Sequence, residues 1–552
     1  MKYKTFICRS CLGLAMMGSL VVTGCTDLLD VERHGATNTS LFYQTAQEAE
    51  EALAALYGCM ASYDWNTGEN IDTNLLSDDC YAGGGSRGDN APLEELNELR
   101  FSPTNHQNKE MYRIYYEALY RANLVINYVD EDASEVHKRC VAEARALRGF
   151  VFLRLASFFG ECPIITEIIE LGNYQRPNNS HAELFAQAEQ DLQDAINSGV
   201  MYEKAHVDDR QAHVTKQFAQ AVLGKCYVYE STYLNVDKWE QAREALTAVI
   251  SSNKYKLYEG NYNDMWHEVG RFSCESIFET NCARDQQNMI STWGYALHGW
   301  RMDKFNQSQL IVANEMGADI SGEKAWGFMN PSKELYDAFV EEEGEDGYRL
   351  NQTITTYKQL CEYPLTLPSG SNVYGNAGYF EKKGAPRKSD EVSASSMLWA
   401  KNQVIMRYAE VLLLAAEAEL PQHGGTQSLV DTYMNMIRER ARVANRPGNY
   451  TLEDIQEEKR LELCFENTRF PDLVRWGLAA SVLKDKGKRI PSLYGLADGN
   501  ESSDGEYVNE NGYLIRNIET SSQGFISNKH EFMPIPQDEL NVNPYATQHT
   551  GW

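Results

Sequence analysis

The chain has 552 residues, with 51 lysines and arginines against 79 aspartates and glutamates, for a formal net charge of −28. A chain of this length can bury a large core. Its acidity argues against nucleic acids and anionic lipids as partners, because phosphate binding requires basic patches. No apolar run beyond the N-terminal region is long enough to span a bilayer.

The N-terminus has the pattern of an export signal. Lys2, Lys4 and Arg9, with no acidic residue among them, precede an apolar run from Leu12 to Val22. This run is too short to cross a bilayer comfortably. The run leads into Val22-Thr23-Gly24 and then Cys25, which resembles a bacterial lipobox. We therefore predict a signal peptide at 1–24, lipidation of Cys25 and a polar tether at 25–40. The alternative is an ordinary secretion signal that happens to contain a cysteine.

The cysteines and histidines indicate no redox or metal chemistry. Nine cysteines follow Cys25 in scattered positions, without a CxxC pair, and we predict no disulfide. The 11 histidines are dispersed, and no HExxH, P-loop or EF-hand motif is present. The sequence thus indicates no metal and no cofactor.

Helical periodicity dominates much of the chain after the predicted tether. Capping boxes begin two of the predicted helices, at Thr45–Glu48 and Ser180–Glu183. The unit 217–255 resembles a tetratricopeptide hairpin in its length and its Trp/Ala/Tyr pattern, and a second helix pair is predicted at 403–420 with 428–443. A final helix is predicted from Thr451 to Glu466.

Two regions interrupt this pattern. Residues 64–109 combine aromatic residues with Asn, Asp, Gly and Thr, which is typical of a long loop. Loops of this length in compact domains are usually either functional or disordered. Residues 281–400 are rich in Gly, Asn, Ser and aromatics, and directly before them Ser276–Thr280 is the best predicted strand. A stretch this long is predicted to form a folded, loop-rich subdomain.

Five segments, in order along the chain, resemble the SusD/RagB family. The most specific runs from Glu458 through Arg469-Phe-Pro-Asp472 to Trp476-Gly477. The others are Tyr120–Asn123, Val141–Pro163, Arg407–Ala418 and the tail from Met533 to Trp552.

The resemblance implies a mainly α fold in which tetratricopeptide-like hairpins form a scaffold, with few short strands. It implies one SusD-like domain at 41–552, divided into a helical scaffold, a loop-rich binding subdomain and a C-terminal tail. The scaffold is expected at 41–63, 110–255 and 401–480, the binding subdomain at 64–109 and 256–400, and C-terminal loops with the tail at 481–552. Five signature residues are expected to form ion pairs between hairpins rather than to contact ligand: Arg148, Glu410, Glu462, Asp472 and Arg475.

The resemblance also implies a function without catalysis. It implies a lipoprotein of the outer membrane, at the cell surface, that captures a nutrient glycan and delivers it to a SusC-like TonB-dependent transporter. Peptide capture of the RagB type is the alternative within the same architecture. A surface glycoside hydrolase is a third hypothesis, because sequence does not reveal whether two carboxylates have the required separation.

Aromatic residues in polar, loop-rich context are the candidate ligand contacts, because the C–H faces of sugars stack on flat rings. The candidates are Trp65, Trp293, Trp300 and Trp326. Asp79, Tyr81 and Arg87 share the first predicted loop with Trp65 and are expected to supply hydrogen bonds. Gly83–Gly88 nearby matches both GxGxxG and GxSxG, but neither match has the required strand before it and helix directly after it.

Overall fold

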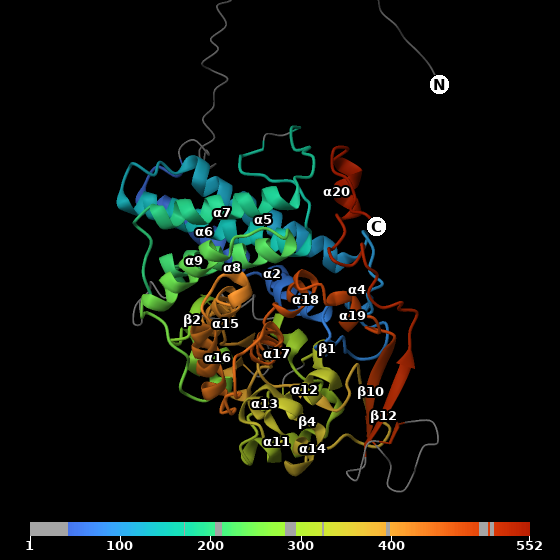
Figure 1. Cartoon of the computed structure of the whole chain (residues 1–552). Coiled ribbons are helices and arrows are strands. Elements are labelled where there is room, and N and C mark those ends of the chain that lie inside the picture. Colours follow the sequence, from blue (N-terminus) through green and yellow to red (C-terminus); the bar gives the residue numbers. More distant parts are fainter. Residues whose placement is uncertain are drawn as a thin grey trace, which may run out of the picture. The chain divides into compact units, whose positions relative to one another are not determined.

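The computed structural model describes residues 42–169, 172–204, 212–281, 294–322, 325–393, 398–495, 506–507 and 513–552. The predicted signal peptide, the tether with Cys25, and Trp293 lie outside these ranges. Residues Tyr43–Trp552 form one unit, in which long helices occupy one part and short elements with small sheets occupy another (Figure 1).

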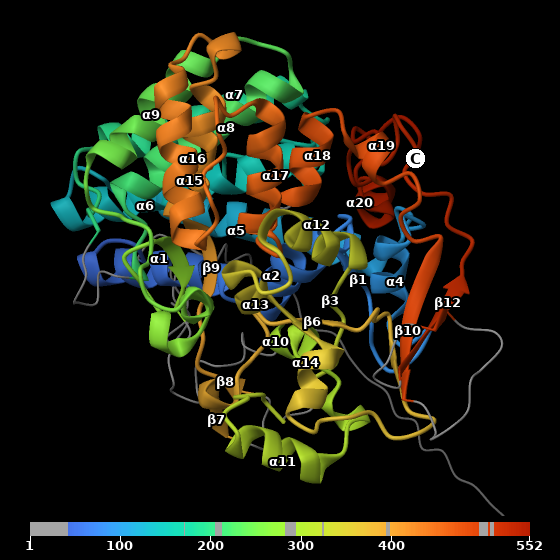
Figure 2. The ribbon, with the colours of Figure 1, turned by 60° about the horizontal axis from the view of Figure 1, so that its bottom comes forward.

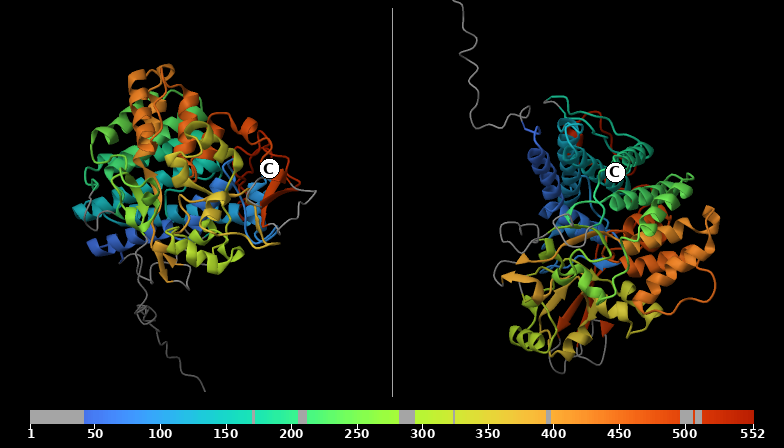
Figure 3. Two further views of the ribbon diagram at one scale, coloured as in Figure 1. Left: turned by 90° about the horizontal axis from the view of Figure 1, so that it is seen from below. Right: turned by 90° about the vertical axis from the view of Figure 1, so that its left-hand side faces the viewer.

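The long helices pack beside one another largely in chain order. Helix α1 contacts α5 and α6, then α6 contacts α7, α7 contacts α8 and α8 contacts α9. Helix α15 packs against α8, α9, α16 and α17, so the array passes from the blue α1 to the orange α15 and α16 (Figure 3, right). The bounds are α1 Ala46–Met60, α5 His106–Tyr128, α6 Glu135–Phe158, α7 His181–Asn197, α8 Lys216–Tyr233, α9 Trp239–Ser251, α15 Tyr408–Ala418, α16 Gln427–Ala441 and α17 Leu452–Leu463.

Local capping explains where several of these helices begin. Thr45 with Glu48 and Ser180 with Glu183 form the predicted capping boxes of α1 and α7. Thr451 with Asp454 caps α17 in the same way. Each box satisfies backbone N–H groups that the first helical turn leaves unpaired. The predicted mainly α fold with helix hairpins is confirmed.

Ion pairs connect neighbouring helices of the array. Arg148 Nη2 on α6 lies 2.6 Å from Asp191 Oδ1 on α7, and Lys225 Nζ on α8 lies 2.7 Å from Glu410 Oε1 on α15. Arg475, on the short helix α18 (Arg469–Arg475), reaches Glu417 on α15 at 2.6 Å. The remaining two signature residues, Glu462 and Asp472, are also in buried ion pairs, with Arg407 and Lys459 respectively. The predicted ion pairing of these residues is confirmed.

Small antiparallel sheets organise the rest of the unit (Figure 2). Strand β2 (Ser276–Thr280), at its predicted position, pairs with β9 (Gln403–Arg407). Strand β4 (Ile354–Thr356) pairs with β6 (Tyr379–Glu381), and β7 (Glu391–Ser393) pairs with β8 (Leu398–Trp399). The largest sheet among the described residues has the order β11-β12-β10-β5. Its strands are β5 Asn372–Tyr374, β10 Arg489–Gly495, β11 Glu506–Tyr507 and β12 Tyr513–Glu519.

Short helices lie between these strands and around them. In chain order they are α2 Tyr63–Thr67, α3 Thr73–Leu75, α4 Ala91–Asn97, α10 Gly294–His298, α11 Gln307–Glu315, α12 Lys333–Glu343, α13 Tyr348–Thr353, α14 Tyr357–Glu362, α19 Ala479–Val482 and α20 Gln537–Val542. The two-residue strands β1 (Cys80–Tyr81) and β3 (Asn330–Pro331) pair with each other.

The expectation of a long loop at 64–109 is wrong. Helix α2 continues through a π-helical turn, Gly68–Asp72, into α3, and the helix α4 follows later in the segment. Residues 65–76 are buried throughout, so tertiary contacts stabilise a helix in a sequence whose Asn, Asp and Thr residues have low helix propensity.

Two further expectations need correction. The helix predicted at 403–420 begins only at Tyr408, because Gln403–Arg407 is strand β9. The tail 481–552, expected to be loops, contains the seven-residue strands β10 and β12, which pair along their full length.

The glycine-rich segment Gly83–Gly88 serves close packing. Gly84 has a φ of +102°, and its N–H donates to the carbonyl of Gly327 at 3.0 Å. A Cβ on Gly83 would collide with that same carbonyl oxygen. Glycine is required here because two backbone segments touch, and neither a nucleotide loop nor a nucleophile elbow follows from the motif.

Candidate functional site

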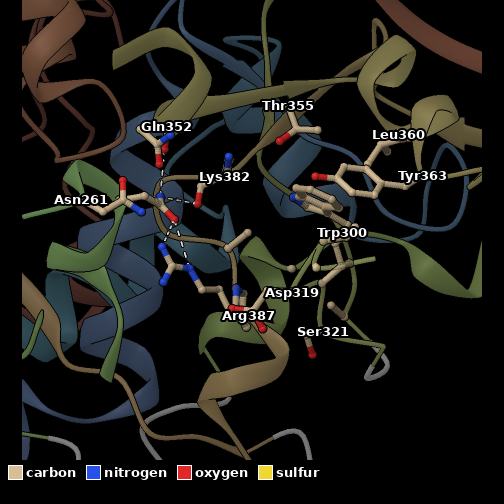
Figure 4. Close-up of a pocket in the computed structure, with 18 residues that line it drawn as sticks. Asn261, Trp300, Asp319, Ser321, Gln352, Thr355, Leu360, Tyr363, Lys382 and Arg387 are labelled. Atoms are coloured by element: carbon tan, nitrogen blue, oxygen red, sulfur yellow. Dashed lines mark hydrogen bonds between the residues drawn. The ribbon is translucent and has the colours of Figure 1, made fainter. Parts of the chain in front are cut away.

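A cavity of about 360 Å³ opens in the part of the unit that holds α11, α13 and α14. Its walls come from separate segments of the chain between residues 261 and 387 (Figure 4). The lining combines one indole, one phenol, aliphatic surface and eight other polar or charged side chains: Asn261, Asn263, Asp319, Ser321, Gln352, Thr355, Lys382 and Arg387.

Trp300 and Tyr363 form the aromatic wall of this cavity. The indole Nε1 of Trp300 donates to the carbonyl of Glu381 at 2.5 Å, and its ring centroid lies 5.3 Å from that of Phe380. These contacts hold the ring in place while part of it stays exposed. Tyr363 follows α14 and packs against the same apolar cluster as Trp300. The wall is thus a fixed aromatic surface beside polar groups, which suits stacking of a ligand with apolar faces and polar edges.

Four polar side chains in the lining have no hydrogen-bond partner among the described residues of the protein. Within the described ranges, the side chains of Asn261, Gln352, Thr355 and Tyr363 form no intramolecular hydrogen bond. Amide and hydroxyl groups both donate and accept, so together they can bind several hydroxyl groups of a ligand. Their exposure to the cavity means that water satisfies them when no ligand is present.

Three charged side chains line the cavity, and they differ in their partners. Arg387 pairs with Asp264 at 2.8 Å and donates to Asn263. Asp319 accepts from the backbone N–H and the hydroxyl of Ser389, at 2.9 and 2.8 Å. Lys382 donates to the carbonyl of Asn351 at 2.8 Å, and its burial, together with the nearby Arg387, lowers the pKa of its ammonium group.

Two predicted ligand contacts belong to the core instead. Trp65 has 0% exposed surface, and its ring packs at 5.5 Å between centroids on Tyr115 and at 6.4 Å on Phe150. A fully buried indole offers no face to a sugar, so Trp65 is reassigned to packing. Asp79 is 1% exposed and pairs with Arg460 Nε at 2.8 Å, which uses its charge inside the fold.

Of the remaining predicted contacts that the structure describes, Trp300 lines the cavity, and Tyr81, Arg87 and Trp326 lie outside its lining. Tyr81 is on β1, and its hydroxyl reaches Glu334 at 3.5 Å. Arg87 forms a two-bond pair with Glu98, at 2.7 and 3.2 Å. Trp326 packs against the pair Ala296 and Trp399. Trp293 lies outside the described residues.

Sequence reasoning therefore found one residue of the cavity, Trp300, and missed its polar lining. Asn261, Gln352, Thr355 and Lys382 carry no local motif, since Asn, Gln, Thr and Lys are common in any polar segment. They form a site only because the loops and short strands that carry them converge in space. Nothing in the spacing of these residues along the chain signals that convergence.

The described helices and side chains give two further results. No helix in the described ranges combines the length and hydropathy of a membrane span. In the same ranges, no group of three or more His, Cys, Asp or Glu side chains is arranged to hold a metal ion.

Comparisons with known proteins agree with this architecture. A family described as "SusD family" matches residues 274–552, and one described as "Starch-binding associating with outer membrane" matches residues 27–228. A SusD-like protein of Bacteroides ovatus is 24% identical, and the match covers 96% of each chain. SusD-like protein P2 of Formosa agariphila is also 24% identical, over 85% of this chain and 91% of the relative.

Solved structures of similar proteins cover most of this chain. A laminarin-binding SusD-like protein is 26% identical, with a TM-score of 0.69, over 92% of this chain and 99% of that one. Surface glycan-binding protein A from Bacteroides thetaiotaomicron, solved with laminarihexaose, is 22% identical, with a TM-score of 0.69, over 91% and 99%. At 22% identity, the similarity to this second structure shows that the fold is shared.

Proposed function

The chain belongs to the SusD family, and from that premise we propose that it is a non-catalytic glycan-binding protein of the cell surface whose ligand binds in the cavity around Trp300. The family assignment supports carbohydrate binding without chemistry, since related proteins are named for laminarin and surface-glycan binding. The position of the glycan and the residues that bind it are proposed from the cavity around Trp300.

The observation that carries the proposal is the combination of a fixed aromatic wall with unpaired polar side chains. Trp300 is anchored through its indole nitrogen, so it can be stacked upon without rearrangement. Asn261, Gln352 and Thr355 have side chains without hydrogen-bond partners in the described part of the protein. A sugar presents C–H faces to the ring and hydroxyl groups to the amides, which matches both features.

The composition of the cavity does not favour a glycoside hydrolase. Such enzymes use two carboxyl groups on either side of the scissile bond. Among the described residues that line this cavity, Asp319 is the one carboxylate. The geometry therefore supports capture of an intact glycan better than its cleavage.

Delivery to a SusC-like transporter and anchoring through a lipid on Cys25 complete the proposal. Both rest on the resemblance of the sequence and on the lipobox-like Val22–Cys25. Replacing Cys25 with Ala is expected to move the protein out of the membrane fraction of cells that lack the transporter. Unchanged membrane fractionation of that variant would reject lipid anchoring at Cys25.

The test of glycan binding uses residues 26–552 in affinity gels and calorimetry, with plant, fungal and mucin glycans and a peptide pool. We expect binding of at least one glycan, recovered at its original chain length. Trp300→Ala is expected to weaken that binding about tenfold or more, which corresponds to roughly 1.4 kcal/mol. Binding of peptide alone would favour the RagB-like alternative, and glycan binding unaffected by Trp300→Ala would exclude this cavity as the site.

A further inference from the structure

The cavity contains a cation that the protein leaves without a carboxylate partner. Lys382 directly follows strand β6, at the point where the chain passes between the cavity and the core. Its Nζ donates to the backbone carbonyl of Asn351 at 2.8 Å. Within the described ranges, no Asp or Glu oxygen lies close enough to Lys382 to form an ion pair.

The neighbouring residue, Lys383, is a cation that stabilises the fold and is fully paired. Lys383 is 1% exposed, and its Nζ lies 2.5 Å from Glu466 Oε1. It also donates to the carbonyls of Glu462 and Cys464, at 2.8 and 3.0 Å. Lys383 is therefore neutralised in the core, while Lys382 lines the cavity.

The other charges of the lining do not neutralise Lys382. Arg387 adds a second positive charge, which Asp264 balances at 2.8 Å. Asp319 has both of its carboxylate oxygens bound by Ser389. Asn263 connects the two cations, since it donates to the backbone carbonyl of Lys382 at 2.9 Å and accepts from Arg387 Nε at 3.2 Å. Figure 4 shows these contacts at the end of the cavity beside Gln352. The charge near Gln352 is thus positive.

From this arrangement we infer that the glycan bound in the cavity is acidic and that Lys382 pairs with its carboxylate or sulfate group. This inference rests on the proposed function and specifies its ligand class. A partly buried ammonium group without a counter-ion is costly, and an anionic ligand supplies the missing partner. Uronic acids and sulfated sugars share the required chemistry, namely an anionic group on a polar ring.

The net charge of −28 does not oppose this inference at short range. Charges separated by more than about 8 Å in physiological salt are largely screened from one another. Recognition within the cavity depends on the groups that line it, whereas the overall charge slows the approach of an anion. We therefore expect slow association at low salt combined with selectivity for the acidic ligand.

The experiment compares acidic oligosaccharides with neutral counterparts of the same length. One arm uses oligogalacturonides and their fully methyl-esterified forms, and the other uses sulfated galactan oligosaccharides and their desulfated forms. Calorimetry on residues 26–552 is expected to give at least about tenfold tighter binding of the acidic member in one arm, in line with a charge-assisted hydrogen bond. The arm in which this occurs identifies the anionic group.

Two matched substitutions assign the preference to Lys382. Lys382→Met is expected to remove the preference for the acidic member over the neutral member. Lys333→Met removes the same charge from an exposed lysine on α12 and is expected to leave that preference unchanged. Circular dichroism checks that both variants are folded.

The possible failures are distinguishable. Equal binding of acidic and neutral members, or a preference that survives Lys382→Met, would overturn the inference and leave the proposed function standing. Absence of binding for every glycan in both arms and in the wider panel would overturn the proposed function, and the inference with it.

Discussion

Two regions of the protein, which meet at Lys382 and Lys383, differ in whether their polar side chains have partners within the fold. On one side lies a buried network, which we call the ion-pair network; its members are Arg349, Lys383, Arg407, Arg438, Arg440, Glu275, Glu343, Glu458, Glu462 and Glu466. On the other side lies the cavity, where several amide and hydroxyl groups have no partner in the described protein. The two regions differ in whether contacts within the fold satisfy their polar groups.

This difference separates polar side chains that stabilise the fold from polar side chains that are available to a ligand. Arg407 alone reaches Glu275 at 2.6 Å, Glu462 at 2.5 Å and Glu466 at 2.7 Å. Arg407, Glu275 and Glu462 are almost fully buried, and the side chain of Glu466 is 12% exposed. Burial alone would raise the pKa of Glu462, but Arg440, Arg407 and Arg349 lower that pKa well below its usual range, so Glu462 stays ionised inside the core. Groups that are paired in this way hold the fold together, whereas unpaired groups facing a cavity are available to a ligand. Four experiments test this distinction.

The largest effect is expected from Arg407→Met. The substitution leaves Glu462 and Glu466 buried with fewer counter-charges, and it should lower the free energy of unfolding by about 3–5 kcal/mol. Chemical denaturation measures the change. The exposed pair Lys333–Asp337 provides the control, because Lys333→Met should cost at most about 1 kcal/mol. Equal losses in the two variants would mean that the network adds no more than surface pairing does.

Trp65→Ala should destabilise the protein by about 3–5 kcal/mol, because it opens a space among Tyr115 and Phe150. Affinity for glycan should be unchanged at temperatures where the variant is folded. Trp300→Ala is the counterpart, with weaker glycan binding and a smaller loss of stability. A loss of binding by folded Trp65→Ala, with little loss of stability, would place the indole at the ligand after all.

Asp72, in the π-helical turn Gly68–Asp72, is a buried carboxyl group with no cationic partner among the residues that the structure describes. Burial raises its pKa from an ordinary 3.8 to about 7, and its oxygen accepts from Gln107 at 3.1 Å. As pH rises from about 4 to 7, the unfolded chain ionises first, so this group costs stability over that window. Asp72→Asn should therefore raise the free energy of unfolding by about 1–3 kcal/mol at pH 7. Denaturation at pH 4 should show almost no change, and an equal gain at both pH values would contradict the assignment.

The smallest effects come from two consecutive threonines of β4. Thr355→Val removes a hydroxyl that faces the cavity, so we expect less than about 0.5 kcal/mol change in unfolding and roughly threefold weaker glycan binding. Thr356→Val removes the cap of α14, which its hydroxyl forms with Gln359, and should cost about 1 kcal/mol without affecting affinity. Calorimetry and denaturation on both variants provide the comparison. A reversed pattern would mean that the roles of the two hydroxyls are exchanged.

Much of the scaffold was predictable because its signals are local. The capping boxes at Thr45 and Ser180 and the strand Ser276–Thr280 lie where the sequence places them. The ion-pair residues were predicted from their resemblance to family signatures, although the partner of Arg148, Asp191, emerged only in the structure. The segment 64–109 was mispredicted because burial, and not propensity, makes it helical.

By itself, the sequence determined the family, the helical scaffold and the presence of a loop-rich region with aromatic residues. These properties follow from periodicity, capping and motif order, which short stretches of chain contain in full. Only the tertiary structure decided that Trp65 is core, that Trp300 lines a cavity, and that Lys382 and Lys383 face opposite environments. The exposure of a side chain and the identity of its hydrogen-bond or ion-pair partners depend on segments distant in sequence. They therefore cannot be read from a residue and its neighbours along the chain.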